Sequence, residues 1–151
     1  MGQIDPYNKA ACLEVICAAN YRKLLRLIPN LRNLDNCTVG KAERKPDLQL
    51  EIIERSAHTL TVKLSHRFHQ FSSELWAPEV EIRIYLDAEL AEVLRDHVRT
   101  DVARVYRDPG KTKEILNYKW RLNYFLMKWL DHCLHIDYRF PERDKLPEAL
   151  A

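Results

Sequence analysis

The chain has 151 residues, of which 46% are apolar and 30% charged, with a formal net charge of +2. This length suits one domain with a core that needs no disulfide or metal. The charge is too small to single out nucleic acid, a membrane surface or an acidic substrate as partner. No apolar run approaches the roughly 20 residues of a membrane span, and the N-terminus lacks a signal-peptide pattern. With four scattered cysteines and no CxxC pair, we expect a reduced, cytoplasmic protein.

The first predicted element is a helix from about Lys9 to Ile28. The dipeptide Asp5-Pro6 is a typical helix-start signal, and Pro29 ends the helix. Its apolar face is made of Leu13, Ile16, Cys17, Leu24, Leu27 and Ile28. Asn20 lies within this face. A buried asparagine needs hydrogen-bond partners, so its position calls for a defined contact.

The segment Asn30–Pro46 is polar, basic and rich in turn formers, and we expect a flexible loop. After it the hydrophobic period changes from 3.6 to 2. Apolar residues alternate with polar ones from Leu48 to Ile52 and from Leu60 to Leu64, with a turn at Arg55–His58. This pattern predicts an antiparallel hairpin with one buried face.

A third strand is predicted from Val80 to Asp87, with Tyr85 and Asp87 on the face opposite Ile84. The segment Ala88–Val98 fits either a helix or a strand that continues through a bulge. A short fourth strand is predicted at Val102–Tyr106.

The best-specified element is the helix Thr112–Ile136. Its apolar residues recur at alternating steps of three and four, with Lys119 at the one break in the series. Phe140–Ala151 reads as a tail. The order of elements predicts a single two-layer α+β domain over residues 1–151, with an antiparallel sheet of about four strands and both terminal helices packed on one of its faces.

Three segments of the chain carry a combined pattern: Cys17-x-x-Asn20-Tyr21 with the leucines up to Pro29, the run Pro78–Val93 containing Ile82-Arg83-Ile84-Tyr85-x-Asp87, and Asn123-x-Phe125-Leu126-x-x-Trp129 up to Leu134. Together they resemble the YqiB-like family of bacterial proteins. They occur in the family's order and span most of the chain. The family's last helix usually carries Glu-Lys ahead of the asparagine, whereas here Tyr118 precedes Lys119. This resemblance implies a fold and shared positions but no reaction.

The polar residues within these segments are the candidate ligand-binding residues. They are Tyr85, Asp87, Glu92, Asn123, Asn20 and Lys119. The alternative is structural: the asparagines bond to backbone at helix–sheet contacts, and Asp87 caps the segment that begins at Ala88.

Other chemistries find less support in the sequence. His132 and His135 are three apart on a helix, but Cys133 points to the apolar stripe, so we expect no metal site and no cofactor. Three glycines cannot build a phosphate-binding loop, and no GxSxG elbow is present.

We therefore expect a non-catalytic binding or regulatory module with a small-molecule or protein partner. One alternative is a small hydrolase or transferase that uses Asp87 and Glu92 as acid–base groups. A second alternative is weak nucleic-acid binding through the basic N-terminal third, although the low net charge argues against such a partner. The cations concerned are Arg22, Lys23, Arg26, Arg32, Lys41, Arg44 and Lys45.

Overall fold

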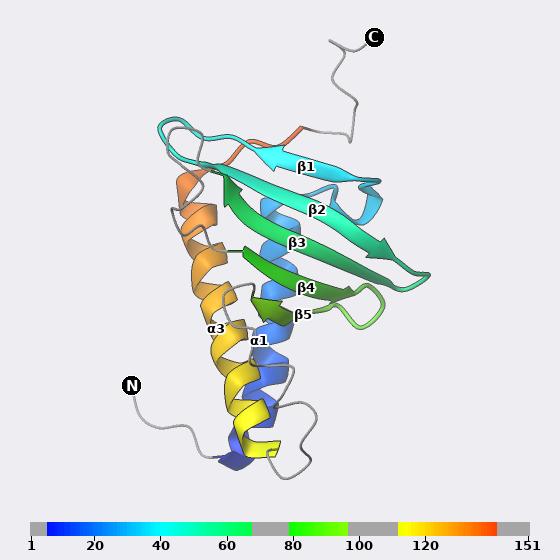
Figure 1. Ribbon diagram of the computed structural model, residues 1–151, viewed down its shortest axis with the longest axis vertical. Coiled ribbons are helices and arrows are strands. Elements are labelled where there is room, and N and C mark those ends of the chain that lie inside the picture. The colour runs from blue at the N-terminus through cyan, green and yellow to red at the C-terminus, as the bar shows by residue number, and fades with distance from the viewer. Residues whose placement is uncertain (1–5, 68–78, 97–111, 142–151) are drawn as a thin grey trace.

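The computed structural model describes residues 6–67, 79–96 and 112–141, and within them it shows two layers (Figure 1). Five antiparallel strands form one sheet in the order β1-β2-β3-β4-β5. Two helices lie side by side and cross the strands on one face of the sheet (Figure 1). The elements are α1 (Pro6–Leu27), η1 (Leu31–Asn33), β1 (Cys37–Gly40), β2 (Asp47–Arg55), β3 (Thr59–Arg67), β4 (Glu79–Tyr85), β5 (Leu90–Asp96) and α3 (Thr112–Ile136).

Both helices form where the hydrophobic period predicts them, and α3 has the expected bounds. On α3 the apolar stripe packs into the core, and Leu126 and Cys133 are fully buried. On α1, Leu24 and Ile28 are likewise fully buried. Within the described residues, neither helix has the length and hydropathy needed to cross a lipid bilayer.

The predicted hairpin is confirmed as β2 and β3. Leu50 pairs with Leu64, and both are fully buried on the helix-covered face. In β4 burial alternates strictly, with Val80, Ile82 and Ile84 buried. The period of two thus determines which side chains enter the core.

The described residues form five strands rather than four. Two of the five, β1 and β5, are not among the strands predicted outright, and β1 lies in the segment expected to be a loop. Residues 30–46 form η1 and then β1, which pairs with β2 through Thr38 and Leu50. The strand is only four residues long and is flanked by polar and basic residues, so its local pattern is weak. Pairing with the long strand β2 stabilises it.

The ambiguous segment Ala88–Val98 begins as a turn and continues as strand β5, and the pairing of β4 with β5 shifts between Glu81 and Ile82. The segment is thus a strand rather than a helix up to Asp96, but it does not continue the third strand through a bulge: it is a separate strand that runs antiparallel to β4 after the turn. The composition of this segment favours a helix, but the backbone hydrogen bonds to β4 outweigh this local preference. The predicted strand Val102–Tyr106 lies outside the described residues.

The chain beyond α3 turns back along β1 before the predicted tail begins. Asp137 has φ 66°, the left-handed conformation that commonly ends a helix. Arg139 then pairs with Lys41 through two backbone hydrogen bonds of 3.0 and 2.9 Å. The ring of Phe140 lies so close to Gly40 that a Cβ there would approach it to 2.4 Å. Phe140, the first residue of the predicted tail, is thus part of the packed structure.

Trp129 tests the packing of α3 on the sheet, because its side chain is only 6% exposed. We expect Trp129→Ala to lower the free energy of unfolding by about 3–5 kcal/mol. Phe125→Ala is the matched control, since Phe125 lies one turn away on the same helix and is 43% exposed. It should cost less than about 1 kcal/mol. Urea unfolding followed by circular dichroism measures both, and equal losses would contradict the described packing.

Candidate functional site

The centre of the candidate site is the side-chain amide of Asn123, which is fully buried on α3. Its Oδ1 accepts a hydrogen bond of 2.9 Å from the backbone N–H of Val93 and a longer one of 3.7 Å from the thiol of Cys17. Its Nδ2 donates to the carbonyl oxygen of Lys119 at 2.8 Å. Val93 belongs to β5, the last strand of the sheet. Among the described strands β5 lies at the edge of the sheet, and Asn123 gives the N–H of Val93 an acceptor on α3.

Asn20 of α1 joins the same network. Its Nδ2 donates to the backbone carbonyl of Asn123 at 3.1 Å, and its side chain is fully buried. Its Oδ1 has no hydrogen-bond partner among the described residues. The asparagine that interrupts the apolar face of α1 thus joins α1 to the backbone of α3, at a helix–helix contact rather than at the helix–sheet contact that the structural alternative expects.

Lys119, Glu92 and Tyr85 form the part of the network nearest to solvent. The Lys119 Nζ lies 3.1 Å from Glu92 Oε2, and their side chains are 27% and 20% exposed. The Tyr85 hydroxyl donates to the other carboxylate oxygen, Oε1, at 3.4 Å. The lysine at the break in the apolar stripe of α3 thus reaches a carboxylate on β5.

Cys17 was not predicted as a site residue, although it lies one turn before Asn20 on the same helix face. Burial raises the pKa of its thiol to about 12, the nearby Glu92 carboxylate adds to the rise, and Lys119 opposes it. The thiol is therefore protonated at neutral pH. It serves as a hydrogen-bond donor rather than a nucleophile.

Asp87 lies apart from the other five candidate residues. It is exposed in the turn between β4 and β5, where its Oδ1 accepts a hydrogen bond of 3.0 Å from the N–H of Ala88. Leu90 pairs with Tyr85 at the start of β5. Glu92 lies two residues beyond Leu90, which is roughly 7 Å further along the strand. No hydrogen bond joins Asp87 to Glu92 among the described residues. The contact observed for Asp87 is the capping contact that the structural alternative predicts.

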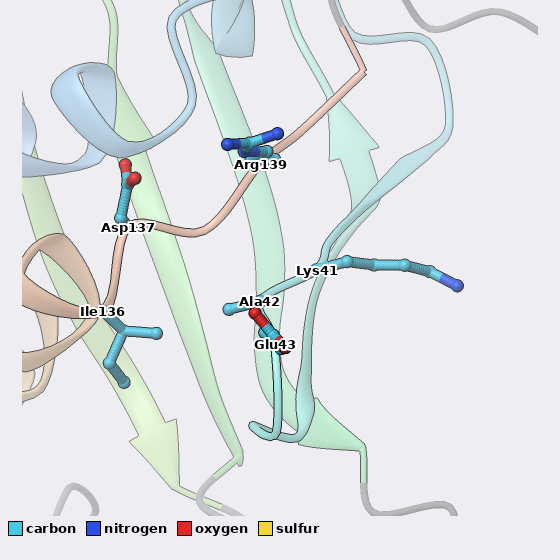
Figure 2. Close-up of a pocket in the computed structure, with 6 residues that line it drawn as sticks. All are labelled: Lys41, Ala42, Glu43, Ile136, Asp137 and Arg139. Carbon is cyan, nitrogen blue, oxygen red and sulfur yellow. The ribbon is translucent and has the colours of Figure 1, made fainter.

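A cleft of about 580 Å³ lies elsewhere, between the β1–β2 hairpin and the end of α3 (Figure 2). Ala42 and Ile136 face each other across it, whereas the Lys41 side chain extends away (Figure 2). The charged side chains that line it, including Glu43 and Arg139, are exposed. None of the six candidate residues lines this cleft, and no buried polar group in its lining is placed to orient a ligand.

A second polar cluster lies where β3 meets the end of α3. The His66 ring packs edge-on against Trp129, with 5.2 Å between the ring centroids. Its Nε2 is 3.3 Å from the Tyr138 hydroxyl, which donates to the carbonyl of Pro46 at 2.8 Å. Burial, with a smaller contribution from His132, lowers the pKa of His66 to about 4. This histidine is therefore neutral at pH 7.

The histidines and cysteine near the end of α3 do not converge. His132 and His135 are exposed, while Cys133 is fully buried and burial raises the pKa of its thiol to about 12. Within the part of the chain that the structure describes, no three potential ligands are grouped to hold a metal ion.

The fold and this network define a small α+β protein whose polar centre connects two helices and an edge strand. The protein family of unknown function DUF1249 matches residues 23–139, and the chain belongs to this family. The chain is 28% identical over 120 residues to the uncharacterised protein YqiB of Escherichia coli K12, covering 79% of this chain and 84% of that protein. The YqiB proteins of strains CFT073 and O157:H7 match equally. No solved structure matches the chain significantly.

Asn123→Ala tests the central amide. The substitution leaves the buried N–H of Val93 without an acceptor, so we expect a loss of about 2–3 kcal/mol in the free energy of unfolding. Asn20→Ala removes a single hydrogen bond and should cost about 1 kcal/mol. The exposed Asn33→Ala is the control, with an expected change within about 0.5 kcal/mol. Hydrogen exchange at Val93 should accelerate in Asn123→Ala alone, and unchanged exchange would contradict the assigned bond.

His66 should make the stability of the protein depend on pH. Its pKa is lowered on folding, so the unfolded chain binds a proton first as the pH falls below about 6.5. The contribution of the neutral His66 to the free energy of unfolding is fully present above pH 6.5. This contribution is lost as the pH falls from 6.5 to the folded pKa of about 4. Because His66 is partly exposed, we expect the loss to be roughly 2 kcal/mol. Urea unfolding at several pH values should show that His66→Gln lacks this component. The exposed His135→Gln should retain it, and an identical pH profile for His66→Gln and the wild type would contradict the assignment.

Proposed function

We propose that this protein is a non-catalytic binding module that takes a small polar ligand at the rim formed by Tyr85, Glu92 and Lys119. The observation that carries the proposal is the ion pair between Lys119 and Glu92. It combines residues from α3 and β5, is partly open to solvent and is supported by the buried Asn123 amide. Rigid elements that hold opposite charges at a partly exposed position are suited to binding.

The geometry favours binding over acid–base catalysis. A general acid or base must exchange a proton with substrate, and an acid–base pair must face a common site. Both oxygens of Glu92 are engaged, one by Lys119 and the other by Tyr85. Asp87 contacts the turn that follows it. These contacts do not support the hydrolase or transferase alternative.

The charges of the pair suggest the ligand class. Lys119 and Glu92 are only 27% and 20% exposed, so a ligand that separates them must itself offer a charged partner to each. A zwitterion with a carboxylate and an ammonium group would satisfy both, with the carboxylate on Lys119 and the ammonium group on Glu92. The Tyr85 hydroxyl adds a third polar contact. We also propose a cytoplasmic location, which is supported by four free cysteines, among them the exposed Cys37.

A thermal-shift screen with free amino acids and other zwitterionic metabolites tests this function. A ligand at about 100 times its dissociation constant should raise the melting temperature by about 5 °C or more. Lys119→Met and Glu92→Gln should each abolish the shift, because each removes one charge that the ligand requires. Asp87→Asn is the matched control and should respond like the wild type, since asparagine also caps the turn.

Two outcomes would contradict the proposal. Either no zwitterion in the panel shifts the wild type, or a shift persists in both charge variants. Loss of the shift in Asp87→Asn together with the charge variants would instead favour the acid–base alternative.

A further inference from the structure

Folding assembles a basic surface that neither the N-terminal third nor the C-terminal helix forms alone. We call it the outer helical face and define it by Arg22 and Arg26 of α1 and Arg121, Phe125 and Lys128 of α3. All five side chains are exposed. They lie on the side of each helix away from its buried residues, at helical spacings that form one stripe per helix.

Ion pairing leaves this face positive. Asp131 is the single acidic residue in the sequence from Ile115 to Ile136, and it forms an ion pair with Lys23 of α1. This pair bridges the two helices. On the strands, by contrast, cations lie beside carboxylates, as in Lys63–Glu79 at 3.4 Å and Arg95–Glu81 at 2.9 Å. The excess positive charge therefore gathers on the helical layer.

Aromatic side chains lie among these cations. Phe125 is 43% exposed and has Arg121 one turn before it and Lys128 one turn after it. The neighbouring Tyr124 stacks on Trp120 with 5.0 Å between ring centroids, and the Lys128 Nζ lies 5.4 Å from the Tyr124 centroid. Cations that alternate with an exposed ring match a phosphate backbone with bases stacked beside it.

We infer that the outer helical face binds single-stranded nucleic acid, with phosphates on Arg22, Arg26, Arg121 and Lys128 and a base against Phe125. The net charge of +2 is an average over the whole chain. It does not argue against a nucleic-acid partner for this one face, where the exposed cations are concentrated. The other basic residues of the N-terminal third lie elsewhere. Arg32 donates to the Tyr21 hydroxyl at 2.9 Å and to the carbonyl of Leu86 at 2.6 Å, and Lys41, Arg44 and Lys45 belong to the β1–β2 hairpin.

Fluorescence anisotropy with a labelled oligo(U) or oligo(dT) strand and the full chain tests the inference, over a salt series from about 50 to 200 mM. Four phosphate contacts predict a slope of log K against log salt of about −3. Arg121→Gln combined with Lys128→Gln should weaken binding about tenfold or more and reduce the slope to roughly half. Phe125→Ala should weaken binding several-fold with the slope unchanged, because it removes stacking and no charge.

The matched control is Arg44→Gln combined with Lys45→Gln, which removes the same charge from the β1–β2 hairpin. It should leave affinity and slope near the wild-type values. Circular dichroism melting checks that each variant is folded, which is expected for exposed side chains. Three outcomes would overturn the inference: no binding at the lowest salt, an equal loss in the hairpin variant, or binding to anionic phosphatidylglycerol vesicles without binding to the oligonucleotide.

Discussion

The amide of Asn123 is the contact on which the arrangement of this protein depends. An edge strand carries N–H groups without partners, and a helix that packs beside it normally covers them without bonding to them. Here the helix supplies an acceptor for Val93, while its own amide nitrogen donates within α3 and Asn20 holds α1 to the same residue. One buried residue, through its side-chain amide and its backbone carbonyl, therefore sets the register of α1, α3 and β5 together. Such a network favours this arrangement because separating the three elements would leave the N–H of Val93 and the Nδ2 of Asn20 without their acceptors.

The same register places the charged rim of the candidate site. Because Asn123 accepts from Val93 and donates to the carbonyl of Lys119, the lysine is positioned one helical turn away, opposite Glu92. The lysine ammonium then compensates the carboxylate, and burial keeps the Cys17 thiol protonated. Both oxygens of the carboxylate are thus engaged, and the thiol donates a hydrogen bond to Asn123. The proposed binding function rests on the opposite charges that these rigid elements hold at a partly exposed position.

Charge is segregated between the two layers, although the chain as a whole is nearly neutral. The described strands carry neighbouring charges of both signs, whereas α3 from Ile115 onward carries one acid, Asp131, and this acid joins α1. The outer surface of the helices is consequently basic, with Phe125 in its midst. The average composition of the chain does not reveal this segregation. The segregation depends on which charged side chains are neutralised by ion pairs in the folded protein.

The sequence determined the elements whose stability comes from their own periodicity. The bounds of α3, the hairpin of β2 and β3 and the alternation of β4 all follow from local apolar spacing, because each element must bury one face. The same spacing marked Asn20 and Lys119 as exceptions that required partners. The spacing alone does not identify those partners. Asn123 approaches Asn20, and Glu92 approaches Lys119, only when α1, α3 and β5 pack together. Tertiary structure alone decided that residues 37–40 form a strand and that residues 90–96 prefer a strand to a helix. In both segments the local preference is weak, and the hydrogen bonds offered by a neighbouring strand outweigh it.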